Sequence, residues 1–203
     1  MNPADYDAWY DSARGRWIGE TEYRLLLNTL APRTGDRVLD VGCGTAWFTR
    51  RLAHDLSGTV TGLDLNADWL KFAAQHDATS AFDCVCSIAA LCFVDNFSLA
   101  LREIVRVTRK RFAIGMLNRH SVLWLEKGRD GGMGAYRGAH WHTPAELRRA
   151  LEPLPVIHLE LTSAVFLPSG STVARWLEKT LPNRVLYGAL LVVAGEKRVN
   201  GES

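Results

Sequence analysis

The stretch RVLDVGCGTAWF at residues 37–48 constrains the fold more than any other part of the sequence. Its apolar residues predict a short buried strand that runs into a turn built on Gly42 and Gly44 and then into a helix. This order places backbone N–H groups at the edge of a parallel sheet, where nucleotide-like ligands bind. The stretch therefore predicts an α/β fold with free turn amides that receive a nucleoside.

The rest of the chain alternates in the same way between short apolar runs and helical patterns. Strands that are apolar throughout and separated by helices indicate a parallel sheet covered on both faces. We expect the last two strands to finish this sheet in antiparallel fashion. The expected strands are 37–42, 59–65, 82–91, 111–117, 155–166 and 184–195, and the expected helices are 20–32, 46–56, 67–76, 97–108, 120–127, 143–151 and 171–181.

Composition and charge argue against several classes of protein. The net charge is only +2, and the basic run at 106–111 is expected to end a helix and face water, so we predict no nucleic-acid partner. The N-terminus lacks an apolar signal region, and the longest late apolar run, 185–195, is too short to span a bilayer. We predict a cytoplasmic protein without a membrane span, whose four cysteines stay reduced.

Two residues distinguish between the cofactor classes that use such a turn. A dinucleotide site needs a third glycine, and Trp47 stands in its place. Asp40 ends the strand close to where a pyrophosphate would lie, and two like charges there cost on the order of 1 kcal/mol in water and more in a crevice. The same carboxylate at the mouth of the turn would attract the sulfonium and ammonium groups of S-adenosylmethionine (SAM). The sequence therefore favours SAM.

Asp64 follows Gly44 by twenty residues, at the end of the next expected strand. A carboxylate there accepts two hydrogen bonds from a ribose diol, each worth about 1.5–3 kcal/mol. This feature suits NAD as well as SAM, so an NAD-dependent oxidoreductase stays open as an alternative.

The segments VLDVGCGTA and TGLDLNADWLKFA resemble motifs I and II of class I SAM-dependent methyltransferases, in particular the type-11 small-molecule group that includes ubiquinone and menaquinone biosynthesis enzymes. The resemblance implies a Rossmann-like fold, SAM as cofactor and a small-molecule methyl acceptor. It also implies one domain over 1–203, with an N-terminal helical cap (1–34), a cofactor-binding half (35–116) and a substrate-side half (117–203).

The resemblance assigns roles by position. The predicted cofactor contacts are Asp40, Gly42, Cys43 and Gly44 around the methionine moiety, Asp64 at the ribose, Leu65 at the adenine, Ser87 and Ile88 in the floor, and Tyr10 and Trp17 in the cap. The cap aromatic residues could equally serve only to pin the cap to the sheet. Tyr136 and His140 are the candidates for the substrate side, and the glycine-rich loop 128–138 is either a lid or a connector. We expect no metal, because His140 and His142 have no third ligand nearby, and no catalytic base is evident.

Two features depart from the family pattern. The last glycine of motif I is replaced by Ala46, which costs energy if its φ is positive. The stretch between Asp64 and Phe82 is too short for a helix and a further strand, so we expect the third, edge strand to be missing or rudimentary. Trimming with homodimerisation at the exposed edge, a covering partner chain and an incomplete sequence are the accounts left open. A noncatalytic or weakly SAM-binding partner protein is accordingly the alternative function.

Overall fold

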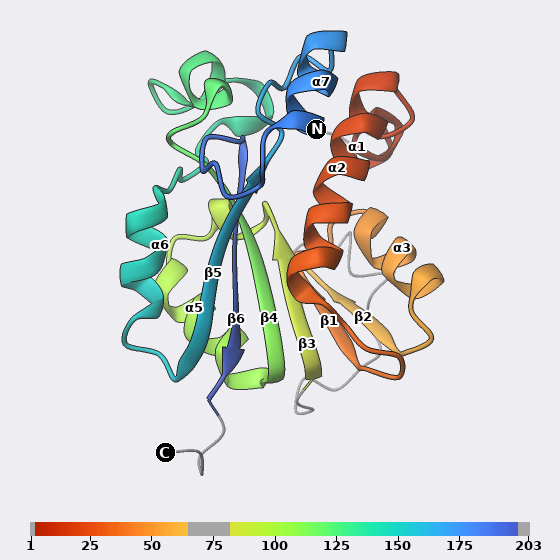
Figure 1. The fold of residues 1–203 in the computed structure, drawn as a ribbon, viewed down its shortest axis with the longest axis vertical. Helices are drawn as coiled ribbons and strands as arrows, with labels where there is room; N and C mark the ends of the chain where they lie inside the picture. The colour runs from red at the N-terminus through yellow and green to blue at the C-terminus, as the bar shows by residue number, and fades with distance from the viewer. Residues whose placement is uncertain (1–2, 65–81, 199–203) are drawn as a thin grey trace.

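The computed structural model describes residues 3–64 and 82–198 of the 203-residue chain (Figure 1). A six-stranded sheet has the order β2-β1-β3-β4-β6-β5, in which β2, β1, β3 and β4 are parallel and β6 is antiparallel to both of its neighbours. The predicted α/β architecture with an antiparallel finish is confirmed. The strands are β1 Val38–Val41, β2 Val60–Leu63, β3 Phe82–Ile88, β4 Thr108–Leu117, β5 Val156–Ala164 and β6 Leu190–Lys197.

Helices cover both faces of this sheet. In Figure 1, α2 and α3 lie in front of the strands, and α5 and α6 lie on the far side. The elements α1, η2, η3 and α7 gather at one end of the molecule, beyond the carboxyl ends of the parallel strands. The helices are α1 Pro3–Trp9, α2 Ala13–Leu30, α3 Trp47–Asp55, η1 Leu91–Phe93, α5 Phe97–Val107, η2 Trp124–Gly128, η3 Gly134–Tyr136, α6 Pro144–Leu151 and α7 Thr172–Thr180.

The core lies between α2 and the middle of the sheet. Leu26 and Leu30 on α2 are fully buried, as are Phe112 and Ile114 on β4. Burying each such side chain contributes about 1.5–3 kcal/mol, so the apolar face of α2 fixes this helix across the sheet. The position of α2 matters because its amino-terminal half carries the cap residue Trp17.

Strand β1 lies between β2 and β3, and the chain leaves β1 on one side to form β2 and returns on the other side to form β3. Asp40 consequently faces Gly62 of β2 and Cys86 of β3 across the ladder. The direction of winding reverses at this point, and open α/β sheets bind ligands at such a reversal, beyond the carboxyl ends of the strands. The fold thus marks the end of β1 as the candidate site.

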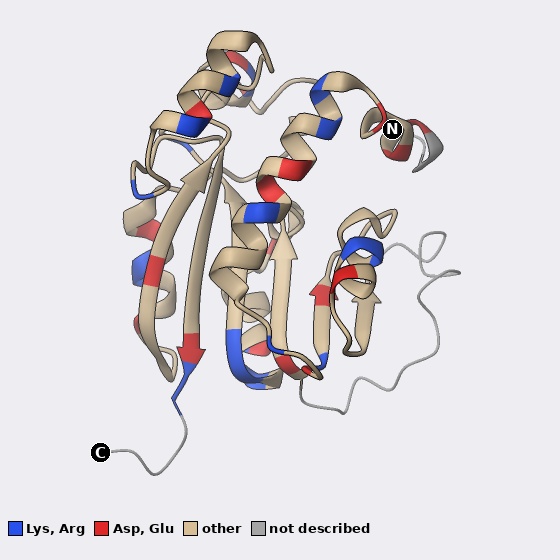
Figure 2. Ribbon diagram, turned by 45° about the vertical axis from the view of Figure 1, so that its right-hand side comes forward, with Lys and Arg blue, Asp and Glu red and all other residues tan. Residues whose placement is uncertain are grey.

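The basic run at 106–111 spans the end of α5 and the start of β4, and Arg106 lies exposed in the last turn of α5. Helix α5 stops at Val107, and residues 109–111 form the first part of β4, at the lower end of the sheet in Figure 2. Lys110 pairs with Asp36 at 2.7 Å and Asp83 at 3.2 Å, and Arg111 donates to the Thr29 carbonyl at 2.7 Å. The prediction of a solvated helix end holds for Arg106 and fails for Lys110 and Arg111, because these two lie in β4 and reach acidic and carbonyl partners on neighbouring elements.

The start of α6 and the state of the cysteines agree with the sequence-based predictions. Thr143 and Glu146 form a complete capping box at the start of α6, as expected. All four cysteines are free thiols, and three of them are buried. The expected helix 67–76 and the missing third strand fall on residues 65–81, outside the described residues. Within residues 3–64 and 82–198, no helix is both long and apolar enough to cross a membrane.

Candidate functional site

The glycine turn follows β1 directly. Gly42 and Gly44 have φ values of +75° and +55°, a region that side chains with a Cβ disfavour. A Cβ on Gly42 would also lie 2.2 Å from the Ala90 Cβ, because the turn passes against the segment after β3. The backbone path itself therefore requires a glycine at position 42.

The amides of this turn are not free. Gly42 and Cys43 both donate to the Leu63 carbonyl, at 2.6 and 3.0 Å, and Gly44 donates to Oδ2 of Asp64 at 2.9 Å. The expectation of free amides was wrong because the parallel pairing of β1 with β2 brings the end of β2 against the turn. The same pairing places the Asp64 carboxylate beside the turn.

Asp40 lies beneath the turn and not at its mouth, with 3% of its surface exposed. Its Oδ2 accepts a hydrogen bond from the Thr49 hydroxyl at 2.6 Å, which ties β1 to the first turn of α3. Burial raises the pKa of Asp40 to about 6, the Asp64 carboxylate adds to the rise, and the Thr49 bond opposes it. The carboxylate is mostly ionised at neutral pH, so its charge acts on the turn from below.

The backbone of Ala46 has a strained, left-handed conformation. Its φ is +63°, and it is the N-cap of α3 without a side-chain hydrogen bond to the helix. A non-glycine residue in this region costs about 1 kcal/mol. Because the φ of Ala46 is positive, the energetic cost expected for an alanine at this position is present.

Two buried hydroxyls near the turn are unsatisfied. Thr45 Oγ1 in the turn and Ser87 Oγ near the end of β3 find no hydrogen-bond partner among the described residues. Leaving a buried hydroxyl unpaired costs about 1–3 kcal/mol, which a polar ligand can recover. Together with the Asp64 carboxylate and the glycine backbone, they fit a nucleoside-bearing cofactor. Ile88 ends β3 beside Gly115, and Leu65 lies outside the described residues.

The two predicted cap aromatics occupy different places. Tyr10 is 5% exposed and stacks on Trp47, with ring centroids 4.4 Å apart and an interplanar angle of 14°, so it covers the start of α3. Trp17 lies under the Arg175 guanidinium at 5.8 Å and contacts the segment at Gly170. Tyr10 is therefore beside the glycine turn, whereas Trp17 packs toward α7.

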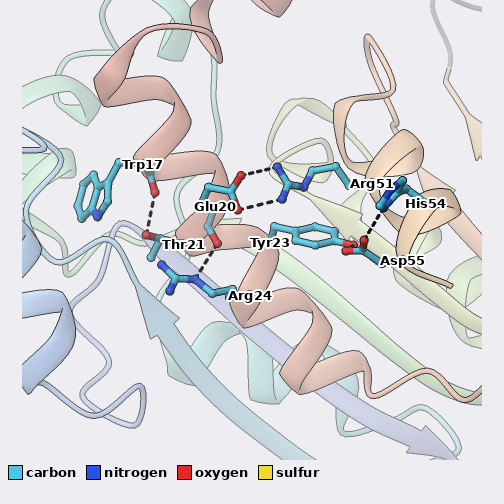
Figure 3. Close-up of polar contacts among 8 residues, drawn as sticks. All are labelled: Trp17, Glu20, Thr21, Tyr23, Arg24, Arg51, His54 and Asp55. Atoms are coloured by element: carbon cyan, nitrogen blue, oxygen red, sulfur yellow. Dashed lines mark hydrogen bonds and ion pairs between the residues drawn. The ribbon is translucent and has the colours of Figure 1, made fainter.

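A polar clasp joins α2 to α3 behind the turn (Figure 3). The Glu20 carboxylate receives two hydrogen bonds from the Arg51 guanidinium, one of them at 2.9 Å. That guanidinium lies over the rings of Tyr23 and Trp47, at 4.7 and 4.8 Å. The Tyr23 hydroxyl donates to Asp55 at 2.7 Å. Sequence reasoning missed this clasp, although the i, i+4, i+8 spacing of Trp47, Arg51 and Asp55 places all three on one helix face.

The substrate-side candidates lie beyond β3 and β4. His140 is exposed, and its backbone amide donates to the Cys92 carbonyl at 2.7 Å. Tyr136 is half-buried, with its ring 5.7 Å from that of Trp141. The His142 imidazole packs on Phe97, and burial lowers its pKa. His140 and Tyr136 therefore both lie in the segment between η2 and α6.

The described residues contain no group of three or more His, Cys, Asp or Glu side chains that could hold a metal ion. Two surface depressions are not lined by the residues of the glycine turn. One is on α3, between Trp47 and Asp55, and the other lies between α2 and β5. The arrangement at the turn is thus suited to binding an organic cofactor through backbone, carboxylate and hydroxyl groups.

Both the sequence and the fold of the chain match those of known proteins. Residues 39–112 match the model of a methyltransferase domain family, and this range holds the turn, Asp64 and Ser87. A SAM-dependent methyltransferase from Thermotoga maritima superposes with a TM-score of 0.74 over 96% of both chains, at 20% identity. Residues 39–112 thus match a methyltransferase domain, and the chain has the fold of SAM-dependent methyltransferases. The cofactor of this methyltransferase family is SAM.

Curated relatives of this methyltransferase domain are longer. An uncharacterised protein of Mycobacterium tuberculosis is 33% identical over 166 residues, which cover 73% of this chain and 56% of that protein. A malonyl-[acyl-carrier protein] O-methyltransferase of Erwinia pyrifoliae is 30% identical over 133 residues, covering 55% of this chain and 50% of that enzyme. The chain spans about half the length of the curated relatives it matches.

Proposed function

We propose that this protein transfers the methyl group of SAM to a small-molecule acceptor. The observation that carries the proposal is the convergence of the glycine turn, the Asp64 carboxylate and two unsatisfied hydroxyls at the reversal point of a methyltransferase domain. Such a site holds a nucleoside at the carboxyl ends of the strands. The bound cofactor would supply a methyl group activated by a sulfonium.

Each site residue has a role in this proposal. Asp64 would accept hydrogen bonds from the ribose diol, and the backbone at Gly42 and Gly44 would approach the methionine part closely, because neither residue has a Cβ. The Ser87 hydroxyl, which lacks a partner among the described residues, would form a hydrogen bond with the cofactor. Asp40 would contribute negative potential from below, which favours a cationic ligand over a diphosphate.

The acceptor would lie between the cap and the substrate-side half, at the end of the molecule where α1, η3 and α7 meet (Figure 1). The chain's contribution to the reaction would be to hold the acceptor atom in line with the methyl carbon and to exclude water. Fixing two reactants in this way can lower the barrier by about 7–11 kcal/mol, so a dedicated catalytic base is not essential.

A thermal-shift measurement tests the proposal. Ligands that bind only the native protein raise the unfolding midpoint, so about 1 mM SAM should raise it by several degrees while NAD at the same concentration leaves it unchanged. Gly42→Ala should lose most of the response to SAM. An unchanged midpoint with SAM in the intact protein would argue against methyl transfer.

A second candidate function rests on Ala46. The strained φ at the position of the family's last glycine favours a chain that binds SAM weakly and acts as a noncatalytic partner protein. Release of S-adenosylhomocysteine during incubation with SAM and an acceptor would argue against this candidate. The homodimer, the cytoplasmic location and the division at residues 34 and 116 remain predictions.

A further inference from the structure

A depression of about 440 Å³ lies between α2 and β5 and shares no lining residue with the glycine turn (Figure 1). Leu25, Asn28 and Thr29 line it from α2, because their i, i+3, i+4 spacing puts them on one helix face. Glu160 and Thr162 line it from β5, where residues two apart share a face of the strand. Ligand sites commonly have volumes of about 300–1,000 Å³, so this depression can hold a small molecule.

The segment 182–184 forms the third side of the depression, and hydrogen bonds hold it against β5. The Ser163 amide donates to the Asn183 carbonyl at 2.7 Å, and the Ser163 hydroxyl donates to the Val185 carbonyl at 2.7 Å. Because Ser163 directly follows Thr162, the same stretch of β5 supplies a lining residue and the anchor of the adjacent side.

Arg111 joins the other two sides. Its Nε donates to the carbonyl of Thr29 on α2 at 2.7 Å, and its guanidinium pairs with Glu160 on β5 at 4.0 Å and with Glu196 at 3.1 Å. All sides of the depression are therefore tied together in the free protein. A site that is already formed loses less conformational freedom on binding, which favours affinity for a small ligand.

One hydroxyl in the lining is buried without a partner in the described part of the chain. Thr162 is 5% exposed, and its Oγ1 finds no hydrogen-bond partner among residues 3–64 and 82–198. Thr29, in the same lining, donates its hydroxyl to the Leu25 carbonyl at 2.8 Å. An unpaired buried hydroxyl is uncommon and destabilises the folded state. A ligand that forms a hydrogen bond with Thr162 removes this cost.

The rest of the lining is also mostly polar. Six of the eight lining residues have polar side chains, and the side chains of Asn28, Asn183 and Arg184 make no hydrogen bond or ion pair with the described residues. Each amide can donate and accept, the guanidinium donates, and the Glu160 carboxylate accepts. This set suits a ligand with many hydrogen-bonding groups and not an apolar one.

The charges of the lining select against charged ligands. Glu160 and Arg184 are its charged residues, so their formal charges of opposite sign cancel. The Glu160 carboxylate repels a phosphate or carboxylate ligand, and the Arg184 guanidinium repels an ammonium ligand. A neutral ligand with several hydroxyls can donate to Glu160 and accept from Arg184 at the same time, because a hydroxyl is both donor and acceptor.

We propose that the depression between α2 and β5 is a second ligand site, which binds a neutral polyhydroxyl compound of monosaccharide size through the Thr162 hydroxyl. This inference goes beyond the proposed function and does not depend on it. The amides of Asn28 and Asn183 hold the ligand from two sides, and Glu160 and Arg184 pair with its remaining hydroxyls.

The test is a two-dimensional ¹H–¹⁵N NMR titration of the intact chain. The neutral probes are D-glucose, D-galactose, D-ribose and myo-inositol, and gluconate, glucosamine and L-serine are the anionic, cationic and zwitterionic comparisons. The expected dissociation constant is on the order of 1 mM, as for other small polar ligands. At least one neutral probe should shift the side-chain amide signals of Asn28 and Asn183 and leave those of Gly42 and Gly44 unchanged. No such shift with any neutral probe, or tighter binding of a charged one, would overturn the inference.

The variant Thr162→Val keeps the shape of the side chain and removes its hydroxyl. Without ligand it should raise the unfolding midpoint by about 2–4 °C, because an unpaired buried hydroxyl is lost, and it should weaken binding of the responding probe about tenfold. Thr108→Val is the matched control, because Thr108 is fully buried but donates its hydroxyl to the Ile104 carbonyl at 2.7 Å. It should lower the midpoint and leave probe binding unchanged.

A second variant acts from the exposed side of the depression. Asn183→Ala removes the free side-chain amide and keeps the backbone carbonyl that Ser163 uses, so the midpoint should stay the same and probe affinity should fall about threefold. Affinity for S-adenosylhomocysteine should be unchanged in all three variants. A lower midpoint in Thr162→Val would show that its hydroxyl has a partner in the free protein, and unchanged probe binding would show that no ligand contacts it. Either result would contradict the inference.

Discussion

The glycine turn and the helical cap are assembled differently. The turn and its acidic partner come from one β–α–β unit, residues 38–64, whose hydrogen bonds join neighbouring elements. The cap contacts join Tyr6 to Tyr10 and Trp17 to Arg175, so they draw on segments near both ends of the chain. A local unit leaves a readable pattern in the sequence, whereas a site gathered from distant segments does not. Substitutions in the two regions should accordingly separate cofactor binding from acceptor binding.

The largest effect is expected at Gly42. Gly42→Ala combines a φ of +75° with a Cβ only 2.2 Å from that of Ala90, so the turn must shift. We expect affinity for SAM to fall by about 100-fold or more, as measured by calorimetry. Gly35→Ala is the matched control, because Gly35 has a φ of +85° with open space around it. It should lose only about 1 kcal/mol of stability and keep its affinity. Equal losses of SAM affinity in both variants would show that the contact at Ala90 is irrelevant.

The Asp64 carboxylate should rank second. Asp64→Asn keeps an oxygen that can accept from the Gly44 amide but loses the charge that strengthens bonds to a ribose. We expect affinity for both SAM and S-adenosylhomocysteine to fall about tenfold. Glu152→Gln, at the exposed C-cap of α6, should leave both affinities unchanged. Normal affinities in Asp64→Asn would remove Asp64 from the ribose site.

Glu22 should affect stability in a pH-dependent way. Burial, and then the Glu178 carboxylate, raise its folded pKa from the ordinary value of 4.5 to about 8, so the folded protein holds the proton more tightly. The cost of an ionised Glu22 is absent below about pH 4.5 and complete above about pH 8. Glu22→Gln should therefore raise the unfolding midpoint at about pH 8 by a few degrees, and by less at about pH 5. An identical shift at both pH values would contradict this titration.

The clasp between α2 and α3 should contribute less. Arg51→Lys keeps the charge but loses the planar fork that holds Glu20 and covers two rings, which should cost about 1 kcal/mol in urea unfolding. Arg50→Lys is the neighbouring control, because Arg50 forms a more exposed pair with Asp7 at 3.0 Å. Similar losses in the two variants would mean that stacking on Tyr23 and Trp47 adds nothing.

The smallest expected change is a gain. Ala46→Gly relieves a φ of +63° and should stabilise the protein by up to about 1 kcal/mol, with affinity for SAM equal or higher. Ala31→Gly relieves a φ of +44° at the end of α2, far from the turn, and should stabilise without changing affinity. A loss of affinity in Ala46→Gly would show that the alanine is adapted to the cofactor.

Sequence reasoning performed well where local physics decides the structure. The strand, glycine turn and helix at 37–48 and the capping box at Thr143 depend on neighbouring residues only, and both were predicted. It failed for Lys110 of the basic run, which lies in β4 and pairs with Asp36 and Asp83 near the starts of two other strands. The prediction of free amides in the glycine turn failed for a similar reason, because the pairing of β1 with β2 supplies acceptors for these amides.

In the candidate site, too, the residues placed by local spacing were predicted, whereas those placed by distant packing were not. Asp64 was placed at the turn by its spacing from Gly44, whereas the depth of Asp40 depends on α3 and β3 packing around it. Trp17 was expected with the cofactor, yet Arg175, more than 150 residues further along the chain, fixes where its ring lies. The Glu22 carboxylate gave no signal in the sequence, since a glutamate within a helix is ordinary until its neighbours are known.

The central claim is that the turn and Asp64 receive a nucleoside sulfonium and not a dinucleotide. The most direct measurement is a calorimetric titration of the intact chain with SAM, repeated in the presence of NADH at about 1 mM. The account predicts one SAM bound per chain and an unchanged affinity in the presence of NADH. Displacement of SAM by NADH, or NADH binding with no SAM binding, would contradict it.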